Sequence, residues 1–164
     1  VLTHDARVAF APGVLATRGE EAAVIVRTDG VFLEFVDGAL VGADEGVPPE
    51  ARDGIGVLVE ARHVTLENLA VRGYRVGVLA RRADGLNLVD AVIEDGFRQR
   101  LGSTWEREDA ADWLSPHAND AGEWRRNYGA AIAVEETVGL LVSGCRARRV
   151  QNGLILDRVE QATV

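Results

Sequence analysis

The sequence predicts an all-β fold, a stacked solenoid with three short strands per coil, forming a single domain over residues 1–164. Two observations predict it. Short apolar segments punctuated by glycine recur at a nearly fixed spacing, and apolar residues alternate with polar ones within each segment. A third observation is that residues 99–127 interrupt the repeat and hold all three tryptophans. We therefore expect a repetitive scaffold that carries one inserted loop.

The amino-acid composition of the chain suits a fold built of thin, stacked layers of strands. The chain has 164 residues, of which 47% are hydrophobic and only 5% aromatic, so the core must be built from Val, Leu, Ile and Ala. The 18 glycines supply turns. Because the chain starts at Val1, contains no Met and ends in a strand-like segment, we expect it to be part of a longer solenoid.

Charge narrows the class of partner. The net charge of −8 argues against a general nucleic-acid binder, which would show a basic face. Neither a polybasic segment nor an apolar run long enough to span a bilayer is present, so we expect no membrane insertion. The single cysteine, Cys145, excludes an intramolecular disulfide, and its place in the repeat predicts a small buried hydrophobe.

Each repeat begins with an apolar segment in which alternate residues are expected to point inward. Val57 and Val78 are 21 residues apart, and Ile132 and Leu154 are 22 apart. The aligned first-strand segments are 56–60, 77–81, 131–135 and 153–157, preceded by a less regular repeat that starts near Val24. Spacing of this size predicts units that bury their apolar residues against neighbouring units.

Two further strands follow the first in each repeat. The second strands are expected to bury Val64 and Leu66, Leu86 and Leu88, and Leu140 and Val142; the third strands are expected to bury Leu69 and Val71, Ala91 and Ile93, and Cys145 and Ala147. A very short corner separates second from third strands. Its predicted occupants are Asp37, Asn68, Asp90 and Gly144, residue types that tolerate the left-handed backbone.

This pattern resembles the right-handed parallel β-helix proteins of the pectate-lyase-like superfamily. The resemblance extends from about Val24 to the end and rests on the three-strand coil, the period of about 22 residues and the corner asparagine Asn68. It implies a right-handed parallel β-helix, a polysaccharide substrate lying along one side of the coil, and a secreted or periplasmic bacterial protein. The polygalacturonase signatures Asn-Thr-Asp, Gly-His-Gly and Arg-Ile-Lys are missing, which counts against a hydrolase of that branch.

Two long excursions of the chain mark the predicted site. Residues 42–55 and 97–128 both follow a third strand and should leave the same side of the coil. The short turn that contains Tyr74 and Arg75 should lie between them. If the two excursions form walls and the short turn forms the floor between them, a cleft is expected on this side of the coil. Residues 104–114 are expected to form a short helix with Thr104 as its N-cap.

The insert offers the chemistry of a carbohydrate site. Trp105, Trp113 and Trp124 provide flat faces for stacking on sugar rings. Tyr74, Arg75, Arg98 and Arg126 are further candidate substrate-binding residues, and the arginines suit a sugar carboxylate. His117 and Arg125 are candidate bases for a lyase, whereas Asp112 and Glu123 would be the acid and base of a hydrolase. No cofactor is required, although the insert's carboxylates could hold Ca²⁺.

Plainer interpretations stay open. The tryptophans could form a small core that fixes the insert to the scaffold, and the mixed charges could be a solvated lattice of ion pairs. The leading hypothesis is a carbohydrate-active protein that binds a polysaccharide, uronate-containing or otherwise acidic, as a possible lyase or epimerase. The alternative is a non-catalytic extracellular protein that binds a glycan or another partner, and a purely structural role is the third possibility.

Overall fold

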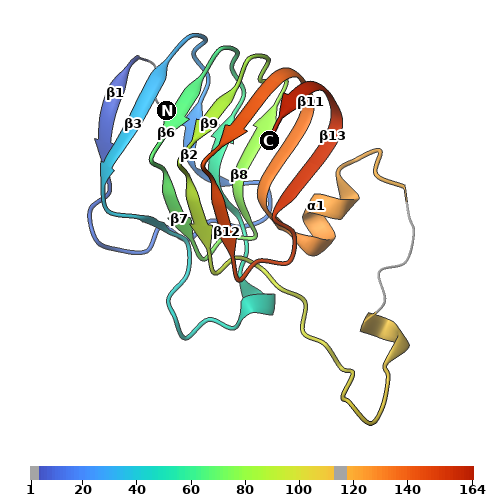
Figure 1. Ribbon diagram of the computed structural model, residues 1–164. Coiled ribbons are helices and arrows are strands. Elements are labelled where there is room, and N and C mark those ends of the chain that lie inside the picture. The colour runs from blue at the N-terminus through green and yellow to red at the C-terminus, as the bar shows by residue number, and fades with distance from the viewer. Residues whose placement is uncertain (1–3, 113–117) are drawn as a thin grey trace.

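The strands are built from the segments predicted by the repeat. The computed structural model describes residues 4–112 and 118–164 (Figure 1). Within them the elements are β1 (Ala6–Ala9), β2 (Ala22–Val26), β3 (Phe32–Asp37), β4 (Leu40–Val41), η1 (Pro49–Ala51), β5 (Ile55–Val59), β6 (Thr65–Glu67), β7 (Ala70–Arg72), β8 (Val76–Arg81), β9 (Asn87–Val89), β10 (Val92–Glu94), η2 (Ala110–Asp112), α1 (Glu123–Tyr128), β11 (Ala130–Ser143), β12 (Arg146–Arg148) and β13 (Leu154–Thr163).

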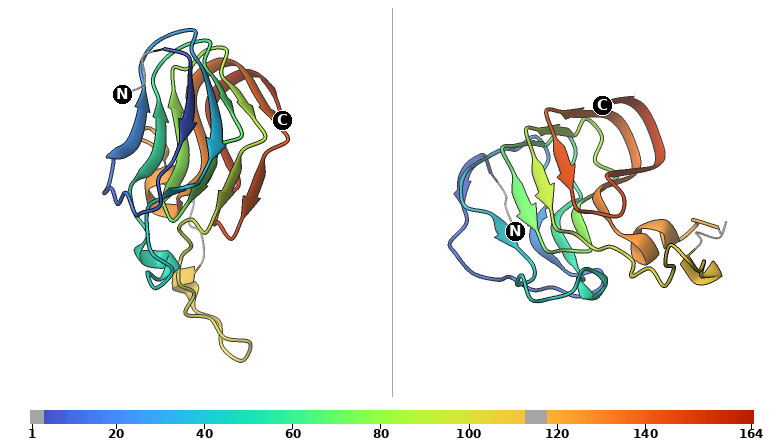
Figure 2. Two further views of the ribbon diagram at one scale, coloured as in Figure 1. Left: turned by 90° about the vertical axis from the view of Figure 1, so that its left-hand side faces the viewer. Right: turned by 60° about the horizontal axis from the view of Figure 1, so that its bottom comes forward.

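These strands form two parallel sheets. In the described residues, one sheet has nine strands in the order β1-β3-β6-β9-β11-β8-β5-β2, with β13 added to β11. The other has four strands in the order β12-β10-β7-β4. Neighbours in both sheets are distant in sequence, as parallel pairing requires, because a parallel neighbour is reached only through a crossover connection. The larger sheet curls around the smaller one (Figures 1 and 2).

The predicted fold class, a right-handed parallel β-helix with three separate strands per coil, is wrong. The first and second strands of the repeats belong to one sheet, which curls into a half-barrel, and its strand order resembles that of parallel sheets in α/β proteins. The reason lies in β11. This strand joins the predicted first and second strands of one repeat without a break, although Glu136 between them has a φ of 51°. It pairs with β8 at one end and β9 at the other.

The residues that the repeat aligned with one another are nevertheless paired between neighbouring strands. Val57 pairs with Val78, Leu66 with Leu88, and Ile132 with Leu154. Each pair stacks one apolar side chain on another, and Val57, Val78, Leu66 and Leu88 are buried in one continuous cluster. Stacking of like residues therefore holds adjacent strands in register, because a slip of one residue would turn every buried side chain to the other face.

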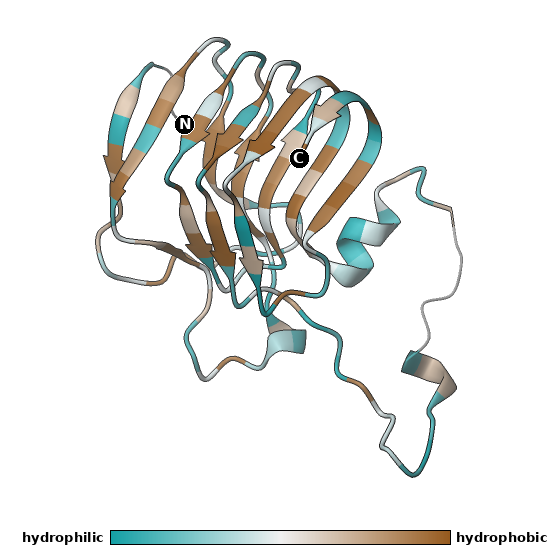
Figure 3. Ribbon diagram, in the orientation of Figure 1, coloured by the Kyte–Doolittle hydropathy of each residue, from teal (hydrophilic) through white to brown (hydrophobic). Residues whose placement is uncertain are grey.

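Burial differs from the simple alternation that the sequence predicted. Leu58 and Leu79 lie on the face of the large sheet opposite to Val57 and Val78, yet they are buried too. They belong to a second apolar cluster, made of Ile55, Leu58, Val76, Leu79, Ala130 and Ala133. Both faces of this part of the sheet are thus apolar, as is common in parallel sheets. Figure 3 shows the hydrophobic residues concentrated along the strands, whereas α1 is largely hydrophilic.

The corner between second and third strands agrees with the prediction in three of four places. Asn68, Asp90 and Gly144 have φ values of 61°, 51° and 65°. In the first repeat the left-handed residue is Gly38, with φ of 76°, and the predicted Asp37 ends β3 instead. Asp37 pairs with Ala9 after a register irregularity between Val8 and Ala9, which shifts the corner by one residue.

Two glycines let the sheets approach each other. A Cβ atom on Gly77 would lie 2.5 Å from Cγ2 of Ile93 in β10, and one on Gly56 would lie 2.8 Å from Cγ1 of Val71 in β7. Side chains of the small sheet therefore fill the space that these glycines leave empty. Packing at this density tolerates no added methyl group without displacing backbone or core side chains.

We predict that Gly77→Ala destabilises the protein by about 1–3 kcal/mol, because the new methyl group overlaps Ile93 and a backbone carbonyl. The change in the free energy of unfolding can be measured by urea denaturation. Gly46→Ala is the matched control, since a Cβ atom there would meet nothing within 4 Å. Equal stabilities for the two variants would contradict the packing described for this interior.

Candidate functional site

The insert, residues 99–127, projects away from both sheets and returns through α1 (Figures 1 and 2). The predicted helix over residues 104–114 is wrong for its described part, which contains a Thr104–Arg107 turn and the single 3-10 turn η2. The hydroxyl of Thr104 accepts a hydrogen bond from the Arg107 N–H at 3.2 Å, so it caps a turn. The only α-helix in the described chain, α1, was not predicted from the sequence.

Arg75 joins the two ends of the insert. Its guanidinium lies 4.0 Å from the centre of the Phe97 ring, where the chain leaves the scaffold. The same group donates a hydrogen bond to the carbonyl of Arg126, where the chain returns, and another to Asp53. The side chain of Arg75, which was predicted to contact substrate, therefore binds groups at the base of the insert.

Arg125 anchors α1 to the large sheet through a ring of four charges. Its side chain is 5% exposed, and it donates to Glu135 at 2.8 Å and to Glu20 at 2.7 Å. Arg81 donates to the same two carboxylates, at 3.0 Å to Glu135 and 2.6 Å to Glu20. Each charge in the ring has two partners of opposite sign, an arrangement that fixes α1 on the outer face of β8 and β11.

The ring shifts the acidity of its members. Burial raises the pKa of the Glu20 carboxyl, but hydrogen bonds and attraction from Arg125 and Arg81 outweigh burial and bring that pKa below its usual value. Burial lowers the pKa of the Arg81 guanidinium, and its two carboxylate partners reverse that effect and raise it. Arg125, a candidate base, is therefore a doubly ion-paired cation in this arrangement.

The two candidate carboxylates of a hydrolase lie on separate turns. Asp112 accepts hydrogen bonds from the N–H groups of Gly102 and Ser103 at 2.8 and 2.7 Å, and these bonds close the far loop of the insert. Hydrogen bonding from Ser103 and then Gly102 keeps the pKa of Asp112 below its usual value. Glu123 accepts from the Ala121 N–H at 3.0 Å and lies 3.6 Å from Arg126.

The aromatic candidates have different environments. Trp105 is 93% exposed, and its indole N–H donates to Glu106 at 2.9 Å. Trp124 is half-buried in α1, with its ring 5.0 Å from that of Tyr128. The side chain of Arg98 is exposed at the root of the insert, where the backbone N–H of Arg98 donates to the carbonyl of Pro49. Trp113 and His117 lie outside the described residues.

Tyr74 does not form the floor of a cleft. Its side chain is 1% exposed, and a Cβ atom on Gly42 would lie 2.6 Å from the ring. The hydroxyl donates to the carbonyl of Leu15 at 2.8 Å, and burial raises the pKa of Tyr74 to about 12. Tyr74 thus supports the segment around Leu15 from inside the protein and is inaccessible to a substrate.

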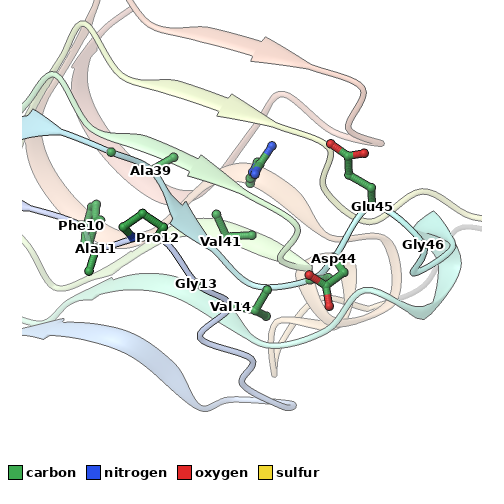
Figure 4. Close-up of a pocket in the computed structure, with 13 residues that line it drawn as sticks. Phe10, Ala11, Pro12, Gly13, Val14, Ala39, Val41, Asp44, Glu45 and Gly46 are labelled. Carbon is green, nitrogen blue, oxygen red and sulfur yellow. The ribbon is translucent and has the colours of Figure 1, made fainter.

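A groove lies beside the first excursion, between residues 10–18 and residues 42–53. Its first part has a volume of about 670 Å³ and is lined by residues of Phe10–Val14 and Ala43–Gly46 (Figure 4). Its second part, about 560 Å³, continues past Thr17 and Asp53. This groove could not be predicted from the sequence, because residues 10–18 carry no repeat, motif or charge cluster.

Part of the charge ring, in contrast, could have been predicted from the sequence. Glu60, Arg81, Glu135 and Asp157 end the four aligned first-strand segments. Charges of both signs at one position of a parallel stack predict ion pairs between neighbouring strands. The other two members of the ring, Glu20 and Arg125, lie 105 residues apart along the chain, and no sequence pattern links them.

No helix in residues 4–112 and 118–164 is long and apolar enough to cross a membrane. Within that same part of the chain, no group of three or more His, Cys, Asp or Glu side chains is placed to hold a metal ion, so the insert's carboxylates do not converge there. The lone thiol of Cys145 is half-buried against the core, and desolvation raises its pKa.

No family model, curated protein or solved structure matches the chain. The resemblance to pectate-lyase-like proteins therefore rests on the residue pattern alone.

We predict that Glu20→Gln lowers the free energy of unfolding by about 0.5–1 kcal/mol at neutral pH, a modest loss because Glu20 is half exposed. The pKa of Glu20 is lower in the folded protein than its ordinary value of 4.5. The contribution of the Glu20 carboxylate to the free energy of unfolding is therefore present above pH 4.5 and disappears as the pH falls through the folded-state pKa. Urea titrations should therefore show a smaller difference from the wild type at pH 3 than at pH 7.

Glu108→Gln is the control for this experiment, since Glu108 is an exposed carboxylate in the insert. It should change stability at neither pH. A loss that persists unchanged at pH 3 would show that the Glu20 side chain acts through packing and not through its charge.

Proposed function

We propose that this protein binds a polysaccharide through the insert and does not turn it over. Trp105 is the observation that carries the proposal. Its indole is almost entirely exposed on a segment that projects from the scaffold, and Glu106 holds the indole N–H. A flat apolar face with a fixed polar edge suits stacking on a sugar ring, and burying that face against a ligand removes a large apolar area from water.

The rest of the insert supports such a role. Arg75 and Arg125 attach both of its ends to the sheets, so a ligand that contacts the insert meets a segment with fixed roots. Preorganisation of this kind lowers the entropy lost on binding. The interior of the scaffold is filled mostly by aliphatic side chains and holds no site for a polar ligand.

The polysaccharide is proposed to be acidic. Arg98 and Arg126 have exposed side chains at the two roots of the insert, and a guanidinium can bind a carboxylate through two parallel hydrogen bonds. The protein as a whole carries a net charge of −8 and repels polyanions. Binding of a uronate-containing chain would therefore depend on these local arginines. A protein that binds such a chain would act outside the cytoplasm, in a secreted or periplasmic location.

Binding is favoured over catalysis by the state of the candidate catalytic groups. Asp112 is held by two backbone N–H groups, and Arg125 is held by two carboxylates. A group that removes a proton from a substrate must reach that proton within hydrogen-bond distance, and these side chains are already bonded within the protein. The lyase or epimerase alternative is tested by incubating the protein with polygalacturonate and alginate, with and without Ca²⁺. Appearance of unsaturated uronate absorbance would refute the binding-only proposal.

We predict that Trp105→Ala weakens binding of the best polysaccharide in a panel of acidic and neutral chains by about 10-fold, the effect expected when a stacked aromatic anchor is removed. The panel would contain polygalacturonate, alginate, hyaluronan, laminarin and cellulose oligosaccharides. Affinity can be measured by isothermal titration calorimetry.

Leu101→Ala is the matched control. Leu101 is also an exposed hydrophobic residue of the insert, 63% exposed, but it has no flat face. Its removal should change affinity less than twofold if planar stacking drives binding. Equal losses for both variants would point to general hydrophobic contact, and unchanged affinity for Trp105→Ala would remove this residue from the site.

A further inference from the structure

We propose that the outer face of the small sheet, next to the root of the insert, binds the carboxylates of the polysaccharide and so selects an acidic chain over a neutral one. This inference rests on the proposed function, because it assigns a second set of contacts to the ligand on which Trp105 would stack. It is carried by five exposed arginines that lie on this face or close to the ends of its strands. We call this set the arginine face: Arg72, Arg98, Arg146, Arg148 and Arg149.

Strand register places three of these arginines on one side of the sheet. Arg72 in β7 is opposite Glu94 in β10, and Glu94 is opposite Arg148 in β12. Neighbouring strands are about 4.8 Å apart, so the Cα atoms of Arg72 and Arg148 are separated by roughly 10 Å. Arg146 precedes Arg148 by two residues in β12 and therefore points to the same side. Ile93, next to Glu94, is buried in the core, so the arginines point outward.

The arginine face borders the root of the insert. The chain leaves β10 and enters the insert through Phe97 and Arg98. Gln151, two residues after Arg149, donates its backbone N–H to the carbonyl of Phe97 at 3.1 Å. The side-chain oxygen of Gln151 accepts a hydrogen bond from the Gln99 N–H at 2.6 Å. A polysaccharide bound to the insert can therefore extend onto the adjoining face of the sheet.

Two carboxylates lie among these arginines, and both are already paired. Asp95 lies 2.6 Å from Nε of Arg149. Glu94 lies 3.3 Å from Arg149 and 3.5 Å from Arg148. The hydrogen bond from Arg149 keeps the pKa of Asp95 below its usual range, so Asp95 is a carboxylate at neutral pH. These two acids therefore offset only part of the positive charge of the arginine face.

The other arginines of this face have no counter-ion. Arg72, Arg98 and Arg146 are exposed, and none of them forms an ion pair within residues 4–112 and 118–164. Burial lowers the pKa of the nearby Arg52 guanidinium, and repulsion from Arg98 and Arg149 adds to this effect although a neighbouring carboxylate opposes it. In a protein of net charge −8, this local excess of guanidinium groups favours an anionic ligand.

A polymer with widely spaced carboxylates fits this face better than a nucleic acid does. Double-stranded DNA carries one charge per about 1.7 Å of its axis, which a continuous basic surface would match. Here Glu94 separates Arg72 from Arg148, so the positive charges are spaced apart. Strands β7, β10 and β12 contain no aromatic residue on which a base could stack. Each guanidinium can instead bind one uronate carboxylate through two parallel hydrogen bonds.

The test compares polygalacturonate with its fully methyl-esterified form, which has the same sugar backbone without the negative charges. Affinities of the whole chain are measured by isothermal titration calorimetry. The double variant Arg72→Gln/Arg146→Gln should weaken binding of polygalacturonate by about 10-fold or more, as expected for loss of two charge-assisted contacts. It should change the affinity for the methyl ester less than twofold. The wild type should therefore prefer the charged polymer, and the variant should lose most of that preference.

Arg18→Gln/Arg82→Gln is the matched control. Both residues are exposed arginines without an ion pair in the described chain, and they lie beside β2 and β8 of the large sheet. This variant changes the net charge equally and should change the affinity for polygalacturonate less than twofold. Equal weakening by the two double variants would reduce the effect to overall charge and overturn the inference.

Failure of this inference is distinguishable from failure of the proposed function. If Trp105→Ala weakens binding of both polymers and Arg72→Gln/Arg146→Gln weakens neither, the insert binds the chain without the arginine face. If neither polymer binds the wild type, both proposals are overturned. Equal affinity of the wild type for the two polymers would also overturn the inference. So would tighter binding of a DNA duplex than of polygalacturonate, because the face would then belong to a nucleic-acid site.

Discussion

Val71 and Ile93 of the small sheet reach across the interior onto Gly56 and Gly77, two strand residues that have no side chain of their own. This close approach sets the thickness of the protein. An interior this thin holds aliphatic residues in stacked columns and has no room for a polar pocket between the sheets. Recognition is therefore left to the outside of the molecule, which includes the insert, the walls of the groove and the arginine face.

The insert and residues 10–15 are attached to the scaffold by different physical means. The insert is held by charge: Arg75 links its two roots, and the ring of Arg81, Arg125, Glu20 and Glu135 fixes α1. Residues 10–15 beside the groove are held by neutral hydrogen bonds and aromatic stacking. Salt and pH should therefore loosen the insert before they affect residues 10–15, because screening and protonation act on charged contacts.

The sequence predicted which residues pair but not how the sheets close. Val57 and Val78 could be aligned because both lie in short apolar segments after glycine, and stacking in register needs no more than that. The continuity of β11 through Glu136 could not be foreseen, because Arg82 has nearly the same φ (49° against 51°) and yet directly follows the end of β8. The shift of the first corner from Asp37 to Gly38 likewise depends on a register irregularity in a neighbouring strand.

For the site, the sequence indicated candidate residues but not their partners. Trp105 was proposed as a stacking residue from its type alone, and its indole is exposed. Tyr74 and Arg125 could not be recognised as supports, because Leu15 and Glu20, their partners, lie in a segment without repeat or motif. Distant polar contacts of this kind are set by the three-dimensional path of the loops, which periodicity along the chain does not determine.

The central claim is that the insert binds ligand while the large sheet serves as a scaffold. Hydrogen–deuterium exchange of the whole chain, with and without saturating polygalacturonate, tests it most directly. We expect slower exchange for amides of residues 97–112 and unchanged exchange in β5 and β8. Protection confined to the strands, or to residues 10–18 and 42–53 with none in the insert, would contradict this account.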